Sequence, residues 1–197
     1  MRDKRVNIAH SKIVNYWKDK AITSDGEIVL EKDANFKDSE PVVYDIGEPE
    51  CWACGKPIGS VYELKTYEKL LADNPEKIWD YAKVRSTLNR CHIYPKCAGG
   101  SEEPSNMFLL CECCHIESPD TANPQNFFKW VYSSKKKPRP LNGFNIQELL
   151  RDFKQDCIEK SKNPFTAKPK DMQVFAHGGK ISQSSIVYAL ADTCDNY

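Results

Sequence analysis

At the start of the chain, the spacing of the apolar residues changes after every few positions, which is typical of a succession of short helices and strands. Apolar side chains recur at helical spacing over residues 11–20, which predicts a short amphipathic helix with Ser11 as its N-cap. After a turn at Asp25, short apolar runs over 27–30 and 42–46 predict two strands. The first part of the chain is therefore expected to form a small helix-and-strand segment.

The pattern becomes more regular in the middle of the chain. Pro75 is typical of the first turn of a helix, and the residues that follow it present one apolar face. Residues 88–94 and 107–110 predict two strands on either side of a loop rich in Gly, Ser and Glu, and residues 111–117 open a helix. A further helix starts at Pro124. Together these elements predict an α+β fold.

The composition of the chain changes after Tyr132. Residues 133–140 have the sequence Ser-Ser-Lys-Lys-Lys-Pro-Arg-Pro, which is typical of a linker, and helices are predicted over 146–158 and 181–193. The sequence thus predicts three parts: an N-terminal helix-and-strand extension over 1–47, a central module over 48–132, and a linker with a helical C-terminal extension over 133–197.

Composition and charge restrict the function less than the pattern does. Of the 197 residues, 40% are hydrophobic and 28% are charged, which is ordinary for a globular protein. The formal net charge is zero, so any surface that binds phosphates must be local. No stretch reaches the roughly 20 apolar residues of a membrane helix, and the N-terminus lacks the apolar core of a secretory signal. We expect a cytoplasmic protein without a membrane partner.

Four of the nine cysteines form two matched pairs, Cys51-x-x-Cys54 and Cys111-x-x-Cys114. Thiolates remain reduced and available in the cytoplasm, and two such pairs match a structural zinc site with four Zn–S bonds of about 2.3 Å. Four thiolates leave the ion no open position, so this Zn²⁺ would stabilise the fold and take no part in a reaction. The alternative is that these cysteines are ordinary core residues.

The second pair has an ambiguous register, because Cys113 adjoins Cys114. The spacing of the first pair favours Cys114 as the ligand. Cys113 is then expected to be a small buried side chain.

Between the two pairs, the chain carries a second pattern: His92, a proline three residues later, the Gly-Gly turn at 99–100, Asn106, and His115 directly after the second pair. This pattern resembles the HNH endonuclease family, in its zinc-containing version with a ββα-metal core. The intervals of 14 and 9 residues between the His, Asn and His positions fit that family, and the resemblance covers about 80 residues.

The resemblance implies a role for each of these side chains. His92 would be the general base that takes a proton from the attacking water, which suits an imidazole near neutral pH. His115 would bind a catalytic divalent ion (Mg²⁺, Mn²⁺ or Ni²⁺) that neutralises charge on the leaving oxygen. Asn106 would either support the metal or orient His92 by hydrogen bonding across the loop, and the sequence leaves both roles open.

The chain departs from the family at Cys91, where many members carry an acidic or histidine metal ligand. A thiol is a poor partner for Mg²⁺, which prefers oxygen. Three outcomes remain open: His115 binds the ion together with Glu117 or Asp120, the site prefers a softer ion such as Mn²⁺ or Ni²⁺, or the nuclease is weakened or inactive.

The expected function is a metal-dependent endonuclease that hydrolyses phosphodiester bonds in DNA, in restriction, defence or a phage. Arg90, Lys96 and Lys129 are candidate phosphate contacts. The basic run at 135–137 is either a further phosphate contact or a solvated part of the linker. The main alternative function is a non-catalytic zinc module that binds nucleic acid or protein, and a second is a zinc-ribbon scaffold. A homodimer remains open.

Overall fold

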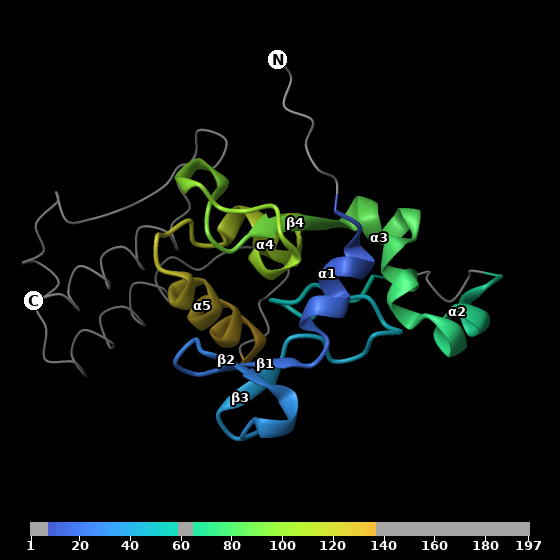
Figure 1. Ribbon diagram of the computed structural model, residues 1–197, viewed down its shortest axis with the longest axis horizontal. Helices are drawn as coiled ribbons and strands as arrows, with labels where there is room; N and C mark the ends of the chain where they lie inside the picture. Colours follow the sequence, from blue (N-terminus) through green and yellow to red (C-terminus); the bar gives the residue numbers. More distant parts are fainter. Residues whose placement is uncertain (1–7, 59–64, 137–197) are drawn as a thin grey trace, which may run out of the picture.

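Two small antiparallel sheets form the frame of the protein, with helices packed around them (Figure 1). The computed structural model describes residues 8–58 and 65–136. The predicted α+β class is confirmed, and none of the helices in the described ranges has both the length and the apolar character needed to cross a bilayer. The helices and strands are α1 (His10–Trp17), β1 (Lys20–Thr23), β2 (Ile28–Leu30), β3 (Ser39–Pro41), α2 (Tyr67–Asp73), α3 (Ala82–Thr87), β4 (Leu88–His92), β5 (Met107–Cys111), α4 (Glu112–Glu117) and α5 (Pro124–Lys136). In the described ranges, short 3₁₀ turns at Glu31–Asp33, Pro75–Asp80, Lys96–Ala98 and Pro104–Asn106 link them.

The first sheet has the strand order β2-β1-β3. Lys20, predicted as the end of a helix, instead begins β1 and pairs with Leu30 of β2. The predicted strand at 42–46 is wrong, because β1 pairs with Ser39–Pro41, and Val42 only closes the ladder through a hydrogen bond from its amide to the Lys20 carbonyl (2.8 Å). The apolar run that suggested a strand is instead a loop that buries its first two side chains.

The second sheet is the hairpin of β4 and β5, paired from Leu88↔Cys111 to His92↔Met107. Both strands lie where the sequence predicts them. All five residues of β5 are buried, and the amide of Trp52 donates a hydrogen bond to the Leu109 carbonyl (3.1 Å). Because α4 starts at the residue after β5, the strand and the helix share one rigid junction.

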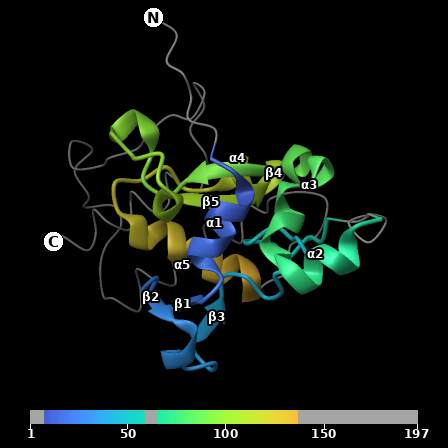
Figure 2. The ribbon, with the colours of Figure 1, turned by 45° about the vertical axis from the view of Figure 1, so that its right-hand side comes forward.

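The core is an aromatic cluster centred on Phe108 of β5. Its ring centroid lies 4.9 Å from that of Trp52, 5.5 Å from that of Trp17 and 5.3 Å from that of Phe127. These side chains come from α1, the loop before α2, β5 and α5, and Figure 2 shows α1, β5 and α5 gathered at the centre of the molecule. The N-terminal extension and the central module therefore share one core. The division of the chain into three parts stays a prediction.

The helix α5 continues four residues into the segment predicted to be a linker. Ser134 is buried there, and the ammonium group of Lys135 donates hydrogen bonds to the carbonyls of Pro41 (2.8 Å) and Val42 (3.2 Å). Lys136 forms an ion pair with Glu40. The first two lysines of the basic run thus fasten α5 to β3. The helices predicted over 146–158 and 181–193 lie outside the described residues.

We expect Phe108→Ala to lower the free energy of unfolding by about 3–5 kcal/mol, because truncating a buried aromatic ring leaves a cavity where several rings now meet. Urea unfolding of the full chain measures this loss. Phe36 is the matched control, since it is 68% exposed and its truncation should change stability by less than about 0.5 kcal/mol. Equal losses from the two variants would contradict the central position of Phe108.

Candidate functional site

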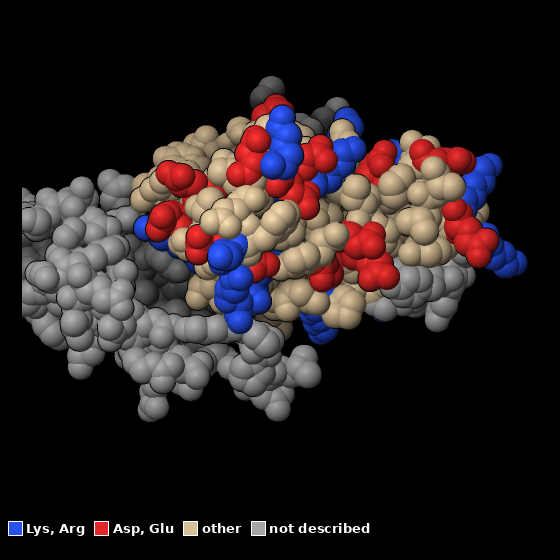
Figure 3. All heavy atoms as spheres, turned by 90° about the horizontal axis from the view of Figure 1, so that it is seen from below, with Lys and Arg blue, Asp and Glu red and all other residues tan. Residues whose placement is uncertain are grey.

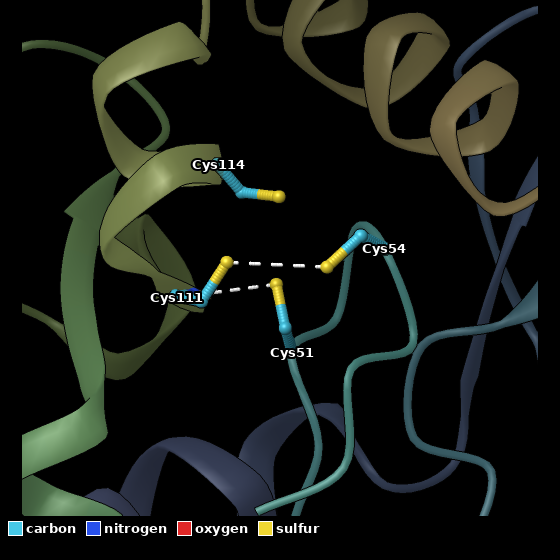
Figure 4. Close-up of side chains that lie close together, drawn as sticks. All are labelled: Cys51, Cys54, Cys111 and Cys114. Carbon is cyan, nitrogen blue, oxygen red and sulfur yellow. Dashed lines mark hydrogen bonds between the residues drawn. The ribbon is translucent and has the colours of Figure 1, made fainter. Parts of the chain in front are cut away.

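Four cysteine sulfurs from two distant segments converge on one point (Figure 4). Cys51 and Cys54 lie in a tight loop, Cys111 ends β5, and Cys114 lies in the first turn of α4. The four sulfur atoms lie within 4.8 Å of one another, and that of Cys54 is 3.9 Å from that of Cys111. Sulfurs at about 2.3 Å from a tetrahedral ion are about 3.8 Å apart, so this donor set fits a structural Zn²⁺.

Contacts among the four thiols shift their pKa values in opposite directions. The amide of Cys111 donates a hydrogen bond to the Cys51 sulfur (3.2 Å), and hydrogen bonds from the Cys114 thiol and the other two thiols hold the pKa of Cys111 well below its usual value. Hydrogen bonding to Cys111 raises the pKa values of Cys51 and Cys114. The loop reverses at Gly55, whose φ of +65° is costly for any residue with a Cβ. Its amide closes the turn on the Cys51 carbonyl (2.9 Å).

The register of the second pair follows from this geometry. Cys114 lies in the cluster, as the matched spacing predicted, whereas Cys113 is exposed. The prediction that Cys113 is buried was wrong, because the residue projects from the outer side of α4, away from the sheet.

His92 stands at the end of β4, beside a carboxylate that sequence reasoning missed. Its Nε2 atom lies 3.6 Å from Oε1 of Glu102, and the same oxygen accepts a hydrogen bond from Nζ of Lys96 (2.5 Å). That bond holds the pKa of Glu102 below its usual value, so Glu102 is ionised at neutral pH. The sequence offered only a weak signal for Glu102, two adjacent glutamates in a polar loop.

Asn106 fastens the backbone directly after His92. Its Oδ1 accepts a hydrogen bond from the Tyr94 amide (2.8 Å), while its Nδ2 donates to the carbonyls of Tyr94 (3.0 Å) and Ser101 (2.9 Å). Gly100 is needed at this point, because a Cβ there would lie 2.0 Å from the Tyr94 carbonyl oxygen. These hydrogen bonds hold the loop that follows His92, and both expected roles of Asn106, support of the metal and orientation of His92, stay predictions.

Cys91 packs into the core. Its sulfur lies 3.3 Å from the hydroxyl oxygen of Ser118, and burial raises the pKa of the Cys91 thiol to about 12. Ser118 follows α4 directly, so this contact joins β4 to the end of the helix. The Cys91 thiol is therefore a small, uncharged, buried group at neutral pH.

His115 is a half-buried residue of α4, the helix that packs on β4 and β5. Its carbonyl accepts a hydrogen bond from the hydroxyl of Ser118 (2.9 Å). Within residues 8–58 and 65–136, the four cysteines are the only group in which three or more histidine, cysteine or carboxylate ligand atoms converge. His115 thus belongs to no second cluster of that size among these residues.

The three candidate phosphate contacts lie in different surroundings. Arg90 donates a hydrogen bond from Nη1 to the carbonyl of Ile8 (3.0 Å), and Lys96 is paired with Glu102 beside His92. Lys129 packs its side chain close to Gly26, at the turn between β1 and β2. Figure 3 shows basic and acidic side chains interspersed on the face that it presents, in keeping with the net charge of zero.

Comparison with protein-family models, curated proteins and solved structures finds no match for this chain. The evidence for the cluster of four cysteines is therefore the positions of its sulfur atoms.

We expect the full-length protein to contain about one zinc ion per chain, because four converging thiolates form a closed tetrahedral site. Elemental analysis and thermal melting measure zinc content and stability. Cys114→Ser should lose the metal and melt at a lower temperature. Cys113→Ser is the matched control and should keep both. Metal loss in Cys113→Ser with retention in Cys114→Ser would refute the assigned register.

Proposed function

We propose that this protein is a metal-dependent endonuclease of the HNH type, which hydrolyses phosphodiester bonds in DNA. The observation that carries the proposal is the junction of β4, β5 and α4. His92 ends the first strand, Asn106 fastens the loop behind it, and His115 follows the zinc ligand Cys114. The strand–strand–helix order and the adjacent cluster of four cysteines match the ββα-metal core that the sequence resembles.

His92 acts as the general base in this proposal. A neutral imidazole accepts a proton from the attacking water molecule. At the same time the oxygen atom of this water forms a bond to phosphorus, and the bond between phosphorus and the leaving oxygen breaks. Glu102 lies on the Nε2 side of the ring, so its carboxylate favours a proton on that nitrogen and stabilises the imidazolium as it forms. Asn106 contributes by holding the backbone of the loop that carries the base.

A divalent ion at this site would neutralise the charge that develops on the leaving oxygen. His115 would hold it together with a carboxylate from Glu117 or Asp120, which lie two and five residues further along the chain. The donor chemistry fits, since imidazole nitrogen with carboxylate oxygen suits Mn²⁺ or Ni²⁺, and the carboxylate suits Mg²⁺.

A second function has one observation in its favour. Cys91, at the position of a metal ligand in many HNH proteins, is a buried thiol against Ser118. A protein that had lost the catalytic ion would keep the zinc cluster and act as a non-catalytic module that binds nucleic acid or protein. A restriction or defence role applies only to the active nuclease.

We expect the protein to nick supercoiled plasmid in the presence of Mg²⁺, Mn²⁺ or Ni²⁺. His92→Ala should lower the rate by about 100-fold or more, because general-base catalysis contributes at least that factor. Gel electrophoresis of the plasmid forms measures the rate, and the variant must keep its zinc and melting temperature. DNA binding without cleavage under every ion would favour the non-catalytic module instead.

We expect Glu102→Gln to slow cleavage and to move the acid limb of the pH–rate profile to lower pH. The carboxylate favours the protonated imidazole, so without it His92 loses its proton at a lower pH. Rates measured across the neutral range test this. The exposed neighbour Glu103 supplies the matched control, and Glu103→Gln should leave the profile unchanged. A uniform loss of rate with no shift would contradict the pairing.

A further inference from the structure

A cavity of about 390 Å³ lies where the start of α1, the end of α3 and the first half of β4 meet. This volume is within the range of small-ligand pockets, about 300–1,000 Å³. In Figure 1 these three elements adjoin one another on the side of the molecule away from β2 and β3. The residues that line the cavity are Ile8, His10, Ala82, Arg85, Ser86, Leu88, Asn89 and Arg90.

The charged groups of this wall are all positive. Arg85 projects from the exposed side of α3, and Arg90 enters from β4. None of the described residues that line the cavity is acidic. The carboxylate of Asp80 is nearby, but it accepts a hydrogen bond from the Ser11 amide (3.1 Å) and pairs with Lys77 (3.7 Å). The wall therefore favours an anion.

The arginine on β4 is held in place before any ligand arrives. Nη1 of Arg90 donates to the Ile8 carbonyl at 3.0 Å, which orients the plane of the guanidinium group. A planar guanidinium group binds two phosphate oxygens through parallel hydrogen bonds, so an oriented one loses little freedom on binding. Asn89 also lines this wall, and the Ser86 hydroxyl donates to the Lys83 carbonyl (2.9 Å).

The ring of His10 lines the same wall. Burial lowers the pKa of His10 to about 4, and the hydrogen bond to the Trp79 carbonyl opposes this. The charge of Arg90 lowers this pKa further, that of Asp80 raises it, and that of Arg85 lowers it. His10 is thus neutral at physiological pH. The attraction for an anion comes from the two arginines.

We infer that this cavity is a phosphate-binding subsite and that it holds a backbone phosphate of DNA beside the one that is cut. The assignment of the phosphate to DNA rests on the proposed function. Arg90 and His92 are two positions apart on β4, hence on the same side of the strand and about 6–7 Å apart along it. A DNA strand that reaches His92 would therefore pass close to the arginine.

A phosphate titration of the full-length protein, followed by NMR, tests the site directly. Inorganic phosphate should shift the amide resonances of Ser86, Asn89 and Arg90 to saturation. Arg85→Gln should weaken this response at least several-fold, and it removes an exposed side chain without disturbing the Ile8 contact. Lys32→Gln, which removes an exposed charge beside the other sheet, should leave it unchanged. If phosphate shifts none of these resonances, the inference is overturned.

Binding of a labelled DNA duplex identifies the source of the phosphate. The measurement uses His92→Ala without divalent ions, so that cleavage plays no part. Each further change, Arg85→Gln or Arg90→Gln, should reduce the slope of log K against log salt by about one, as loss of one phosphate contact does. Unchanged slopes with retained phosphate binding would overturn the assignment to DNA. Absence of cleavage under any ion would contradict the nuclease proposal alone and leave this result standing.

Discussion

The convergence of four sulfur atoms is the constraint on which the rest of the site depends. It joins a loop near residue 51 to the junction of β5 and α4, about 60 residues later in the chain. Trp52 lies between the two cysteines of the loop, is fully buried, and packs its ring 4.9 Å from that of Phe108. The cluster and the aromatic core therefore stabilise each other. A bound ion would fix the start of α4, and with it the position of His115, one residue after a ligand.

A second, independent constraint acts at the other end of the hairpin. His92 is the last residue of β4, where a strand end would ordinarily fray. Asn106 prevents this by bridging both backbone groups of Tyr94, and the absence of a side chain at Gly100 permits the close approach. The contacts of Asn106 are made by neutral groups, whereas the pair of Lys96 and Glu102 in the same loop is ionic. The two ends of the hairpin thus position the two histidines by different means, one by sulfur ligands and one by amide hydrogen bonds.

The sequence predicted the features that depend on short-range spacing. Two cysteine pairs with equal spacing and two apolar runs are each visible within a few neighbouring residues, and they predicted the cluster and the hairpin correctly. The failures depend on tertiary contacts. The third strand was predicted at 42–46 instead of at Ser39–Pro41, because an apolar run is compatible with either a strand or a buried loop. The ammonium of Lys135 reaches the carbonyl of Pro41 across 94 residues, and the approach of Glu102 to His92 depends on how a ten-residue loop closes. Periodicity carries no signal for such contacts.

The distribution of charge around His92 suits the role of general base that we propose for it. A cation beside the ring would make the imidazole less basic, whereas a carboxylate makes it more so. The ammonium group of Lys96 is near the ring, but Glu102 contacts both groups. One carboxylate oxygen of Glu102 lies beside Nε2 of His92 and accepts a hydrogen bond from the ammonium group. The base is therefore shielded from the nearest positive charge. Binding of a polyanion still needs cations, and in the inferred phosphate subsite Arg85 of α3 and Arg90 of β4 supply them. In this proposal a carboxylate lies beside the base and the arginines lie before it in the chain, so a protein with no net charge carries both features.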